Sequence, residues 1–339
     1  MLKSRSAAAL AAIAVTAAVL LAPSPAAAAA PPPVFAPSGG IADPGVVRTN
    51  GDFYAFSTGT RAPLSRGDEA GGPWRDLANP ALGSAAAWAD PGAIWAPDAV
   101  QTSAGWVLYF SAPASGKNGQ RCIGTATSDS VEGPYVPSIS ALICPGGSHG
   151  ADDPVAGRPV AGAGVIDPSP FQATDGRRYV LYKTQQTPSS LRMLQVDDAG
   201  LAGIDTSQEL VQNSGIIENP VMVQRGNYYV LLASRFGFDN CSYATVWMRS
   251  TGRWNFANAA EHTLLSTSGT GICGPGGADI SPSLDGGWRI FLHGWVCGSG
   301  TSPCRPADAP FTGPHRRVLY AAVLNWGSDG ATPSVGAFL

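Results

Sequence analysis

The chain has 339 residues and a formal net charge of −3, and 13% of its residues are charged, against about 25% in a typical soluble domain. No Lys/Arg cluster forms the concentrated basic face that nucleic acids and anionic membranes require, so we exclude both as partners and expect a neutral substrate. With 42 Gly and 29 Pro, the composition is typical of a turn-rich, all-β protein.

The first 30 residues have the pattern of a secretory signal peptide. Lys3 and Arg5 precede an apolar run from Ala7 to Leu21, and an Ala-rich stretch follows up to Ala30. The apolar run has about 15 residues, which is shorter than the roughly 20 that a membrane-spanning helix needs. We therefore predict a secreted, extracellular protein with a signal over residues 1–30 and a single domain over residues 31–339.

A repeated unit follows, in which a carboxylate precedes by seven to nine residues a glycine that opens an aromatic and aliphatic strand. The five acids are Asp43, Asp98, Asp167, Glu218 and Asp279, and the five glycines are Gly51, Gly105, Gly176, Gly226 and Gly287. The glycines are 54, 71, 50 and 61 residues apart, close to the length of one four-stranded propeller blade. The repeat predicts an all-β fold, a five-bladed β-propeller.

Each unit also has the pattern of a β-hairpin, with glycine or asparagine at the turn and β-formers after it. The acid then lies at or near the start of the strand before the turn. Because the innermost strands of a propeller line its central channel, we expect the five acids to occupy corresponding positions and to converge on the axis.

The six cysteines are even in number and lack the paired spacing of a zinc site: Cys122, Cys144, Cys241, Cys273, Cys297 and Cys304. In an exported chain, this predicts three disulfides. Of the possible connectivities we favour pairing between sequence neighbours, which joins Cys122 to Cys144, Cys297 to Cys304 and, by elimination, Cys241 to Cys273. We assign them a stabilising role only.

Several of the acids stand beside proline, as in Asp43-Pro44 and Asp167-Pro168, and any one of these pairs alone is ordinary turn chemistry. A set of them among apolar neighbours is harder to explain, because a buried carboxylate is costly. Glycoside hydrolysis uses such a set: one carboxylic acid protonates the leaving oxygen while a carboxylate on the opposite face activates water.

At these residues the sequence resembles glycoside hydrolase family 43, through the elements ADPG, IWAPD, IDPSPF, IENPV and HRRVLYAAVLNW, in the family's order. The resemblance runs from about Ile41 to Trp326 and implies a five-bladed propeller enzyme. It further implies cleavage of α-L-arabinofuranosyl or β-D-xylosyl linkages of plant cell-wall polysaccharides, with inversion at the anomeric carbon. By the same resemblance Asp43 is the general base, Glu218 is the general acid, and Asp167 orients Glu218 and favours its protonated form.

The resemblance also implies residues that bind the substrate. Trp95 and Asp98 of IWAPD, with Ser169 and Phe171 of IDPSPF, are expected to line the subsite for the terminal sugar, although core packing is the alternative for Trp95. Either Arg316 or Arg317 matches a late arginine that reaches a sugar hydroxyl.

His293 stands where many arabinanases have an axial histidine near a calcium ion, although a histidine inside a β-strand is more often a buried structural residue. No cofactor is otherwise expected, and we expect a monomer.

The chain departs from the family pattern in two places. Asn219 follows the general acid where glycine is usual, and GPGGAD at Gly274–Asp279 lacks a histidine that often lies beside the pocket, a space that Asp279 would fill. In addition, the Gly/Pro-rich stretch from Gly146 to Gly164 reads as a loop at the pocket rim that favours exo action.

Our leading hypothesis is that the protein is an inverting α-L-arabinofuranosidase or arabinanase. A β-xylosidase of the same family is the nearest alternative, and a non-catalytic sugar-binding propeller is another, although all three catalytic acids are present. A retaining enzyme of the invertase type is disfavoured because its Arg-Asp-Pro element is absent.

Overall fold

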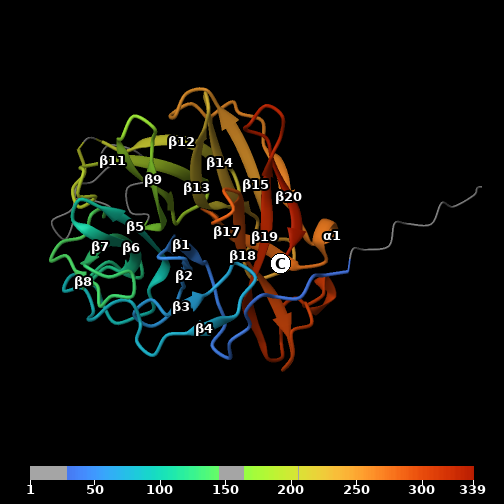
Figure 1. Ribbon diagram of the computed structural model, residues 1–339. Helices are drawn as coiled ribbons and strands as arrows, with labels where there is room; N and C mark the ends of the chain where they lie inside the picture. Colours follow the sequence, from blue (N-terminus) through green and yellow to red (C-terminus); the bar gives the residue numbers. More distant parts are fainter. Residues whose placement is uncertain (1–28, 145–163, 205) are drawn as a thin grey trace, which may run out of the picture.

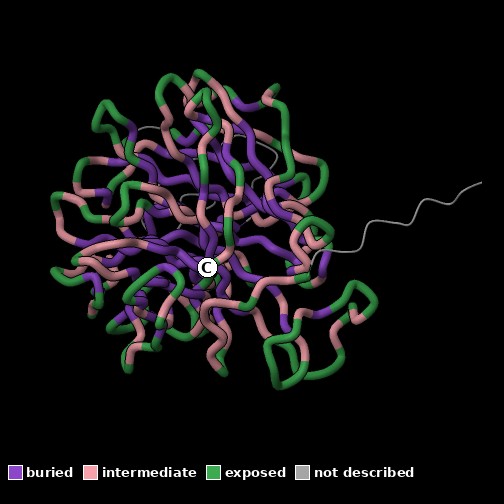
Figure 2. Tube along the Cα trace, turned by 45° about the vertical axis from the view of Figure 1, so that its right-hand side comes forward, coloured by how far each residue is buried: buried purple, intermediate pink, exposed green. Residues whose placement is uncertain are grey.

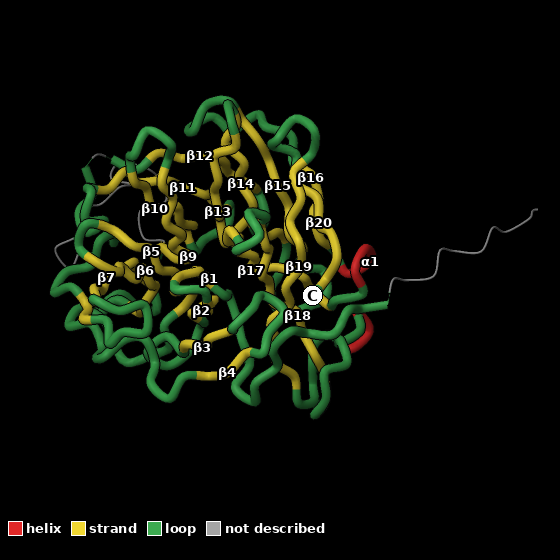
Figure 3. The backbone as a smooth tube through the Cα atoms, viewed as in Figure 1, coloured by secondary structure: helices red, strands yellow, loops and turns green. Residues whose placement is uncertain are grey.

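The structure, a computed structural model, describes residues 29–144, 164–204 and 206–339. The predicted signal peptide, apart from its last two positions, and nearly all of the predicted rim loop from Gly146 to Gly164 lie outside the described residues. Strands and connecting loops make up nearly all of the described chain, with short helices at one edge (Figure 3). In this described part, no helix is long and apolar enough to cross a membrane.

The strands form five antiparallel sheets of four strands each, so the predicted five-bladed β-propeller is confirmed. Blade 1 contains β1 (Gly45–Thr49), β2 (Asp52–Phe56), β3 (Leu64–Gly67) and β4 (Trp74–Asp76). Blade 2 contains β5 (Trp95–Thr102), β6 (Gly105–Pro113), β7 (Arg121–Ser128) and β8 (Val136–Pro137). Blade 3 contains β9 (Val165–Gln172), β10 (Arg178–Thr184), β11 (Ser189–Val196) and β12 (Gln208–Asn213).

Blade 4 contains β13 (Ile217–Arg225), β14 (Tyr228–Arg235), β15 (Ala244–Ser250) and β16 (His262–Leu265). Blade 5 contains β17 (Cys273–Pro282), β18 (Trp288–Cys297), β19 (His315–Trp326) and β20 (Pro333–Phe338). The short helices are α1 (Thr267–Thr270) and η2 (Pro306–Asp308). The first strands of the five blades contact one another in a ring and surround the centre of the molecule (Figure 1).

The predicted hairpin turns join the first two strands of each blade. In blade 1, Thr49 pairs with Asp52 across a two-residue turn, and Asn50 and Gly51 both have positive φ, as this tight turn requires. In blade 5 the positive φ belongs to Gly286 and not to Gly287.

The expected equivalence of the five acids is wrong in detail. In the first half of each first strand, or two residues before it in blade 1, stands a residue with φ between 41° and 57°, and in four blades that residue is followed by proline. These residues are Asp43, Ala96, Asp167, Asn219 and Gly277. Two acids, Asp43 and Asp167, occupy this position itself; Glu218 stands one residue before it, and Asp98 and Asp279 stand two residues after it. The acids therefore lie at three different heights along the axis.

The ring closes between blades 5 and 1 through the chain's N-terminal segment. Phe35 exchanges backbone hydrogen bonds with Leu319 of β19, and the Ile41 N–H donates to the Arg317 carbonyl at 2.8 Å. This segment occupies part of the β19 edge and leads directly to Asp43.

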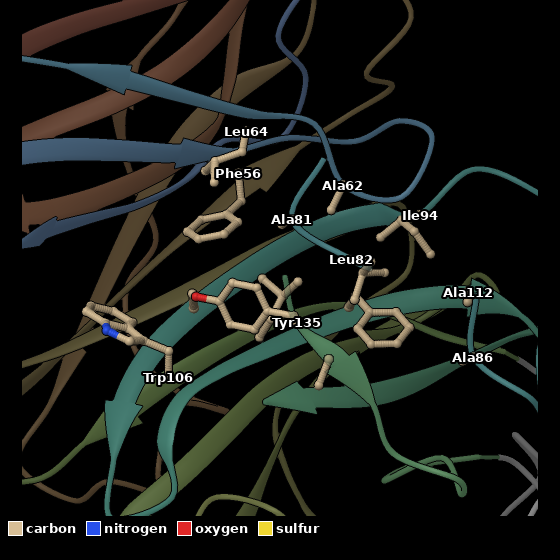
Figure 4. Packing of buried hydrophobic residues seen from close by; sticks show 14 of the residues in the cluster. Phe56, Ala62, Leu64, Ala81, Leu82, Ala86, Ile94, Trp106, Ala112 and Tyr135 are labelled. Carbon is tan, nitrogen blue, oxygen red and sulfur yellow. The ribbon is translucent and has the colours of Figure 1, made fainter. Parts of the chain in front are cut away.

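The core is divided among the interfaces between neighbouring blades, because each sheet buries both of its faces. Phe56 and Leu64 of blade 1 pack with Trp106 and Tyr135 of blade 2 in one such cluster (Figure 4). Comparable clusters lie between each other pair of adjacent blades. Buried residues accordingly fill the interior, and exposed residues gather at the turns (Figure 2).

All three predicted disulfides are confirmed: Cys122–Cys144, Cys241–Cys273 and Cys297–Cys304. The first lies within blade 2, the second ties the β14–β15 loop to the start of β17, and the third closes the loop after β18.

Candidate active site

A cavity of about 390 Å³ opens at one end of the central axis and receives side chains from all five blades. Its polar lining includes the three predicted catalytic acids, and two of its aromatic rings, Trp95 and Phe238, are 37% and 48% exposed. Carboxylates combined with exposed rings are the mixture that a sugar pocket requires. The lining residues are Asp43, Thr58, Trp95, Ile166, Asp167, Lys183, Gln185, Ile216, Glu218, Asn219, Phe238, Tyr243 and Arg317.

Asp43 is held in its ionised form by two donors. Arg317 Nη1 donates to Oδ1 at 2.9 Å, and Thr58 Oγ1 donates to Oδ2 at 2.7 Å. Burial alone would raise the pKa of Asp43, but the Arg317 charge and these hydrogen bonds outweigh it and lower that pKa below its usual value. The carboxylate is thus fixed in position and able to accept a proton at neutral pH.

Glu218 is anchored by one donor on each carboxylate oxygen. Lys183 Nζ lies 2.6 Å from Oε2, and Tyr243 Oη donates to Oε1 at 2.9 Å. Glu218 and Lys183 are both more than nine-tenths buried, so this ion pair is shielded from solvent. The two anchors fix the direction in which the Glu218 carboxyl points.

Asp167 lies in an environment that favours its protonated form. Burial first, and then the charge of Glu218, raise its pKa to about 7, although Lys183 and the Asn219 N–H, which donates to Oδ2 at 3.1 Å, oppose the shift. Asp43 and Asp167 are therefore separated in acidity: the first carboxylate is ionised where the second retains a proton.

Of the predicted sugar-binding residues, Trp95 and Arg317 line this pocket, whereas Asp98, Ser169 and Phe171 lie elsewhere. Asp98 and Ser169 line a smaller cavity on the axis, which is formed largely by the left-handed residues of the first strands and the two residues after each of them. Phe171 is buried against Tyr179 and Tyr229 in the core between blades 3 and 4. These three residues are two or four positions beyond the left-handed residue of their strand, which takes them down the axis or into the core.

Asp279 also lies in the axial cavity and not beside the pocket. Its Oδ2 accepts the Val46 N–H at 2.6 Å and its Oδ1 accepts the Ile280 N–H at 2.7 Å. Burial raises its pKa to about 7, and burial together with Asp279 raises the pKa of Asp98 well above its usual value. We call Asp98 and Asp279 the lower pair of acids, since both line the axial cavity, where Asp279 is bound to the backbone of the propeller.

The structure distinguishes the two candidate arginines. Successive residues of a strand point to opposite faces, and it is Arg317 that reaches Asp43, while Arg316 pairs with Val296 in the ladder and does not line the pocket.

His293 does not fit as a calcium ligand. Its Nδ1 accepts the Asp43 N–H at 3.1 Å, so in the neutral ring the hydrogen is on Nε2, and an N–H cannot coordinate a cation. Burial, and then the charge of Arg317, lower the pKa of His293 to about 3, which keeps the ring neutral. Across the described residues, no group of three or more His, Cys, Asp or Glu could hold a metal ion.

The departure at Asn219 has a conformational reason. Its φ is 53°, in the left-handed region, which glycine adopts freely and asparagine tolerates better than most residues. Its side chain turns toward the Ala278 carbonyl, with Nδ2 at 3.4 Å from that oxygen.

Sequence reasoning missed five pocket residues: Thr58, Lys183, Gln185, Phe238 and Tyr243. Lys183 carried a weak signal, because it directly follows the apolar run Tyr179–Tyr182 and a lysine that continues such a run into the core needs a partner. Phe238 and Tyr243 both come from the loop between β14 and β15, where nothing in the sequence marks them.

Comparisons with known proteins agree with the chemistry that the pocket residues indicate. The sequence model described as glycosyl hydrolases family 43 matches residues 33–332. A probable arabinan endo-1,5-alpha-L-arabinosidase C from Aspergillus niger is 25% identical over 280 residues, covering 74% of this chain and 81% of that protein. Extracellular endo-alpha-(1->5)-L-arabinanase 2 from Bacillus subtilis is 25% identical over 222 residues, covering 59% of this chain and 45% of that protein.

Solved structures share the fold. The α-L-arabinanase of Cellvibrio cellulosa, solved in complex with arabinohexaose, superposes with a TM-score of 0.65 at 20% identity, covering 88% of this chain and 95% of that one. A thermostable family-43 glycoside hydrolase gives a TM-score of 0.68 at 18% identity, covering 88% and 93%.

Proposed function

This chain belongs to glycosyl hydrolase family 43 and is a glycosidase, and from that premise we propose that it is a secreted hydrolase of α-L-arabinofuranosyl linkages in arabinan or arabinoxylan. The observation that carries the proposal is the arrangement of Asp43, Asp167 and Glu218 around one pocket, each with different partners. The mechanism we propose is single displacement with inversion.

Asp43 acts in this proposal as the general base. A base must be ionised to take a proton from water, and the contacts of Arg317 and Thr58 favour that state. Each contact uses one lone pair of a carboxylate that has about four, so room is left for a water molecule on the pocket side. Backbone position is supported by His293, whose Nδ1 accepts the Asp43 N–H.

Glu218 acts as the general acid. Because it is paired with Lys183 in the structure, it must receive a proton before it can give one to the leaving oxygen, and we assign that supply to Asp167. The pKa of Asp167, raised to about 7, provides a protonated carboxyl that is coupled to Glu218 up to near-neutral pH. Lys183 and Tyr243 hold Glu218 toward the position of the leaving oxygen. In each turnover Asp43 gains a proton from water and Glu218 loses one to the leaving oxygen. Asp43 must then release its proton to solvent, and Glu218 must regain one through Asp167, whose pKa its charge influences.

The choice of arabinose rests on the named relatives, several of which are arabinan-cleaving enzymes. A β-xylosidase is the second candidate, since a relative from Humicola insolens named xylosidase/arabinosidase 43A is 36% identical over 89 residues. The pocket's two exposed rings would accept the apolar face of either sugar.

Secretion is part of the proposal. It is supported by the signal-peptide pattern before Pro31 and by three disulfides, which persist in oxidising compartments. We propose that the protein acts as a monomer on plant cell-wall polysaccharide and requires no cofactor.

The test is incubation of the purified protein, without its signal, with an aryl α-L-arabinofuranoside, an aryl β-D-xyloside, debranched arabinan and arabinoxylan. We expect arabinose or short arabino-oligosaccharides from the wild type, and none from debranched arabinan or arabinoxylan with Glu218→Ala, with the size of the products distinguishing endo from exo attack. Proton NMR of the first product formed reports the anomeric configuration, and the inverted anomer is expected. Release of xylose alone would mean that the protein is a β-xylosidase. No cleavage of any of the four substrates would favour a non-catalytic, sugar-binding propeller.

A further inference from the structure

Trp95 and Arg121 form the closest cation–π contact of the described chain. Arg121 Cζ lies 3.4 Å from the centroid of the Trp95 ring, so the guanidinium carbon is in van der Waals contact with the face of the indole. Trp95 is 37% exposed and lines the pocket, whereas Arg121 is only 6% exposed. One face of the indole is therefore covered by a buried guanidinium, and the rest of the exposed ring belongs to the pocket.

Arg121 is itself fixed in place. Its Nη1 donates to the Ala93 carbonyl at 2.8 Å and to the Ser111 carbonyl at 3.1 Å, and its backbone N–H donates to Gln185 Oε1 at 2.8 Å. The next residue in the chain is bonded through the Cys122–Cys144 disulfide. The guanidinium plane has little freedom to turn away from the indole.

Trp95 needs such support, because its own backbone provides little. It is the first residue of β5, and the pairing register with β6 shifts between Trp95 and Asp98. The next residue, Ala96, has a φ of 41°. A large side chain at the irregular end of a strand has alternative rotamers, and ordering it on binding would cost affinity.

Packing alone does not account for an arginine here. A buried cation is expensive, and an apolar side chain of similar volume would fill the space at least as well. An arginine is suited to this place by its flat guanidinium, which stacks on an aromatic ring while its edge donates to carbonyls.

We propose that Arg121 is a positioning residue, which holds the Trp95 indole as a one-sided platform for the apolar face of a sugar ring bound in the pocket. The inference rests on the proposed function and adds to it the residue that pre-orders the platform. Arg121 touches no substrate in this proposal and acts through Trp95.

A second route by which Arg121 could act is its charge. Burial lowers the pKa of Arg121 to about 10, and the charge of Asp167 opposes this shift, so the side chain is cationic at neutral pH. Its charge therefore interacts with that of Asp167. The two routes differ in what lysine can replace. Lysine keeps the charge but lacks the flat, forked group, so Arg121→Lys would rescue an electrostatic role and not a stacking one.

The experiment measures the Kd of an arabino-oligosaccharide by calorimetry in a Glu218→Gln background, in which cleavage is expected to be slowed about 10²–10⁴-fold. Arg121→Lys and Arg121→Met should each weaken binding roughly three- to tenfold, the order expected from a cation–π contact and lost pre-ordering. Trp95→Ala should weaken it at least as much. In the Trp95→Ala background, Arg121→Lys should cause no further loss, because its only route to the sugar has been removed.

Arg225 supplies a matched control, since its Cζ lies 4.8 Å from the Trp326 ring and neither residue lines the pocket. Arg225→Lys should leave the Kd unchanged. In the cleaving enzyme, Arg121→Lys should raise KM and leave kcat and the pH profile nearly unchanged.

Two failures can be told apart. If the Glu218→Gln protein binds no arabino- or xylo-oligosaccharide, the proposed function fails and this inference fails with it. If that protein binds but Arg121→Lys binds equally well, or weakens binding equally with and without Trp95, only the inference is overturned. Unchanged binding by Trp95→Ala overturns it even if the Arg121 variants do not fold.

Discussion

Arg317 donates to Asp43 at 2.9 Å although 274 residues separate them in the chain. The contact spans the point where blade 5 meets blade 1, beside the hydrogen bond from the Ile41 N–H to the Arg317 carbonyl. Closure of the ring between blades 5 and 1 therefore also brings Asp43, the proposed base, to its cationic partner Arg317.

This contact predicts a pH effect. Arg317→Met should raise the pKa of Asp43, because burial already acts in that direction and its main opposing charge would be gone. A base is lost to protonation as pH falls, so the acidic limb of the kcat/KM profile should move to higher pH. Arg316→Met is the matched control, one residue away and outside the pocket, and its profile should keep the wild-type limb. Coincident acidic limbs for Arg317→Met and the wild type would mean that Asp43 is not the titrating base.

A second prediction concerns the leaving group. If Glu218 protonates the leaving oxygen, Glu218→Gln should slow cleavage of arabinan by about 10²–10⁴-fold. It should slow an activated aryl arabinofuranoside much less, since that leaving group departs with little protonation. Comparing kcat on the two substrates gives the answer, and an equal loss on both would remove Glu218 from this role.

The sequence predicted the repeat, the blade number, the disulfides and the acids of the pocket, because each depends on local pattern or on spacing along the chain. Asp-Pro and Asn-Pro pairs marked where first strands begin, and the structure has left-handed residues there. The same pattern could not distinguish Asp43 from Asp98, since a difference of two residues in a bulged strand moves a side chain from the pocket to the axial cavity.

Partner side chains were not predictable in the same way. Tyr243 reaches Glu218 from the loop between β14 and β15, and Thr58 reaches Asp43 from the loop after β2. Such contacts depend on how loops fold over the end of the propeller, and single sequences carry little signal for that.

The Lys183–Glu218 pair leads to a third prediction, on stability. Lys183→Met leaves Glu218 without its cation at a buried site, which typically costs about 3–5 kcal/mol. Guanidinium denaturation with the disulfides intact should show this loss. The double variant Lys183→Met/Glu218→Gln contains neither charged group, so no unpaired charge remains buried. It should therefore be more stable than the sum of the two single effects implies. Simple additivity would show that the pair does not interact in solution.

The last prediction concerns the lower pair of acids. The folded-state pKa of Asp98 is raised above the usual value of 3.8 by burial and by Asp279, so between that value and the raised one the folded protein holds a proton that the unfolded chain releases. Its contribution to stability is therefore fully present below about pH 4 and declines as pH rises. Asn cannot ionise, so Asp98→Asn should avoid this decline.

The variant should gain stability relative to the wild type as the pH rises above about 4, measured as the difference in Tm at each pH. Asp285→Asn is a suitable control, since the hydrogen bond from Arg289 lowers the pKa of this exposed acid and it is already ionised throughout that range. The control should give a flat difference. If the Asp98→Asn difference is equally flat, Asp98 is not held protonated in the axial cavity, and the two acids must be separated by a partner that keeps both charged.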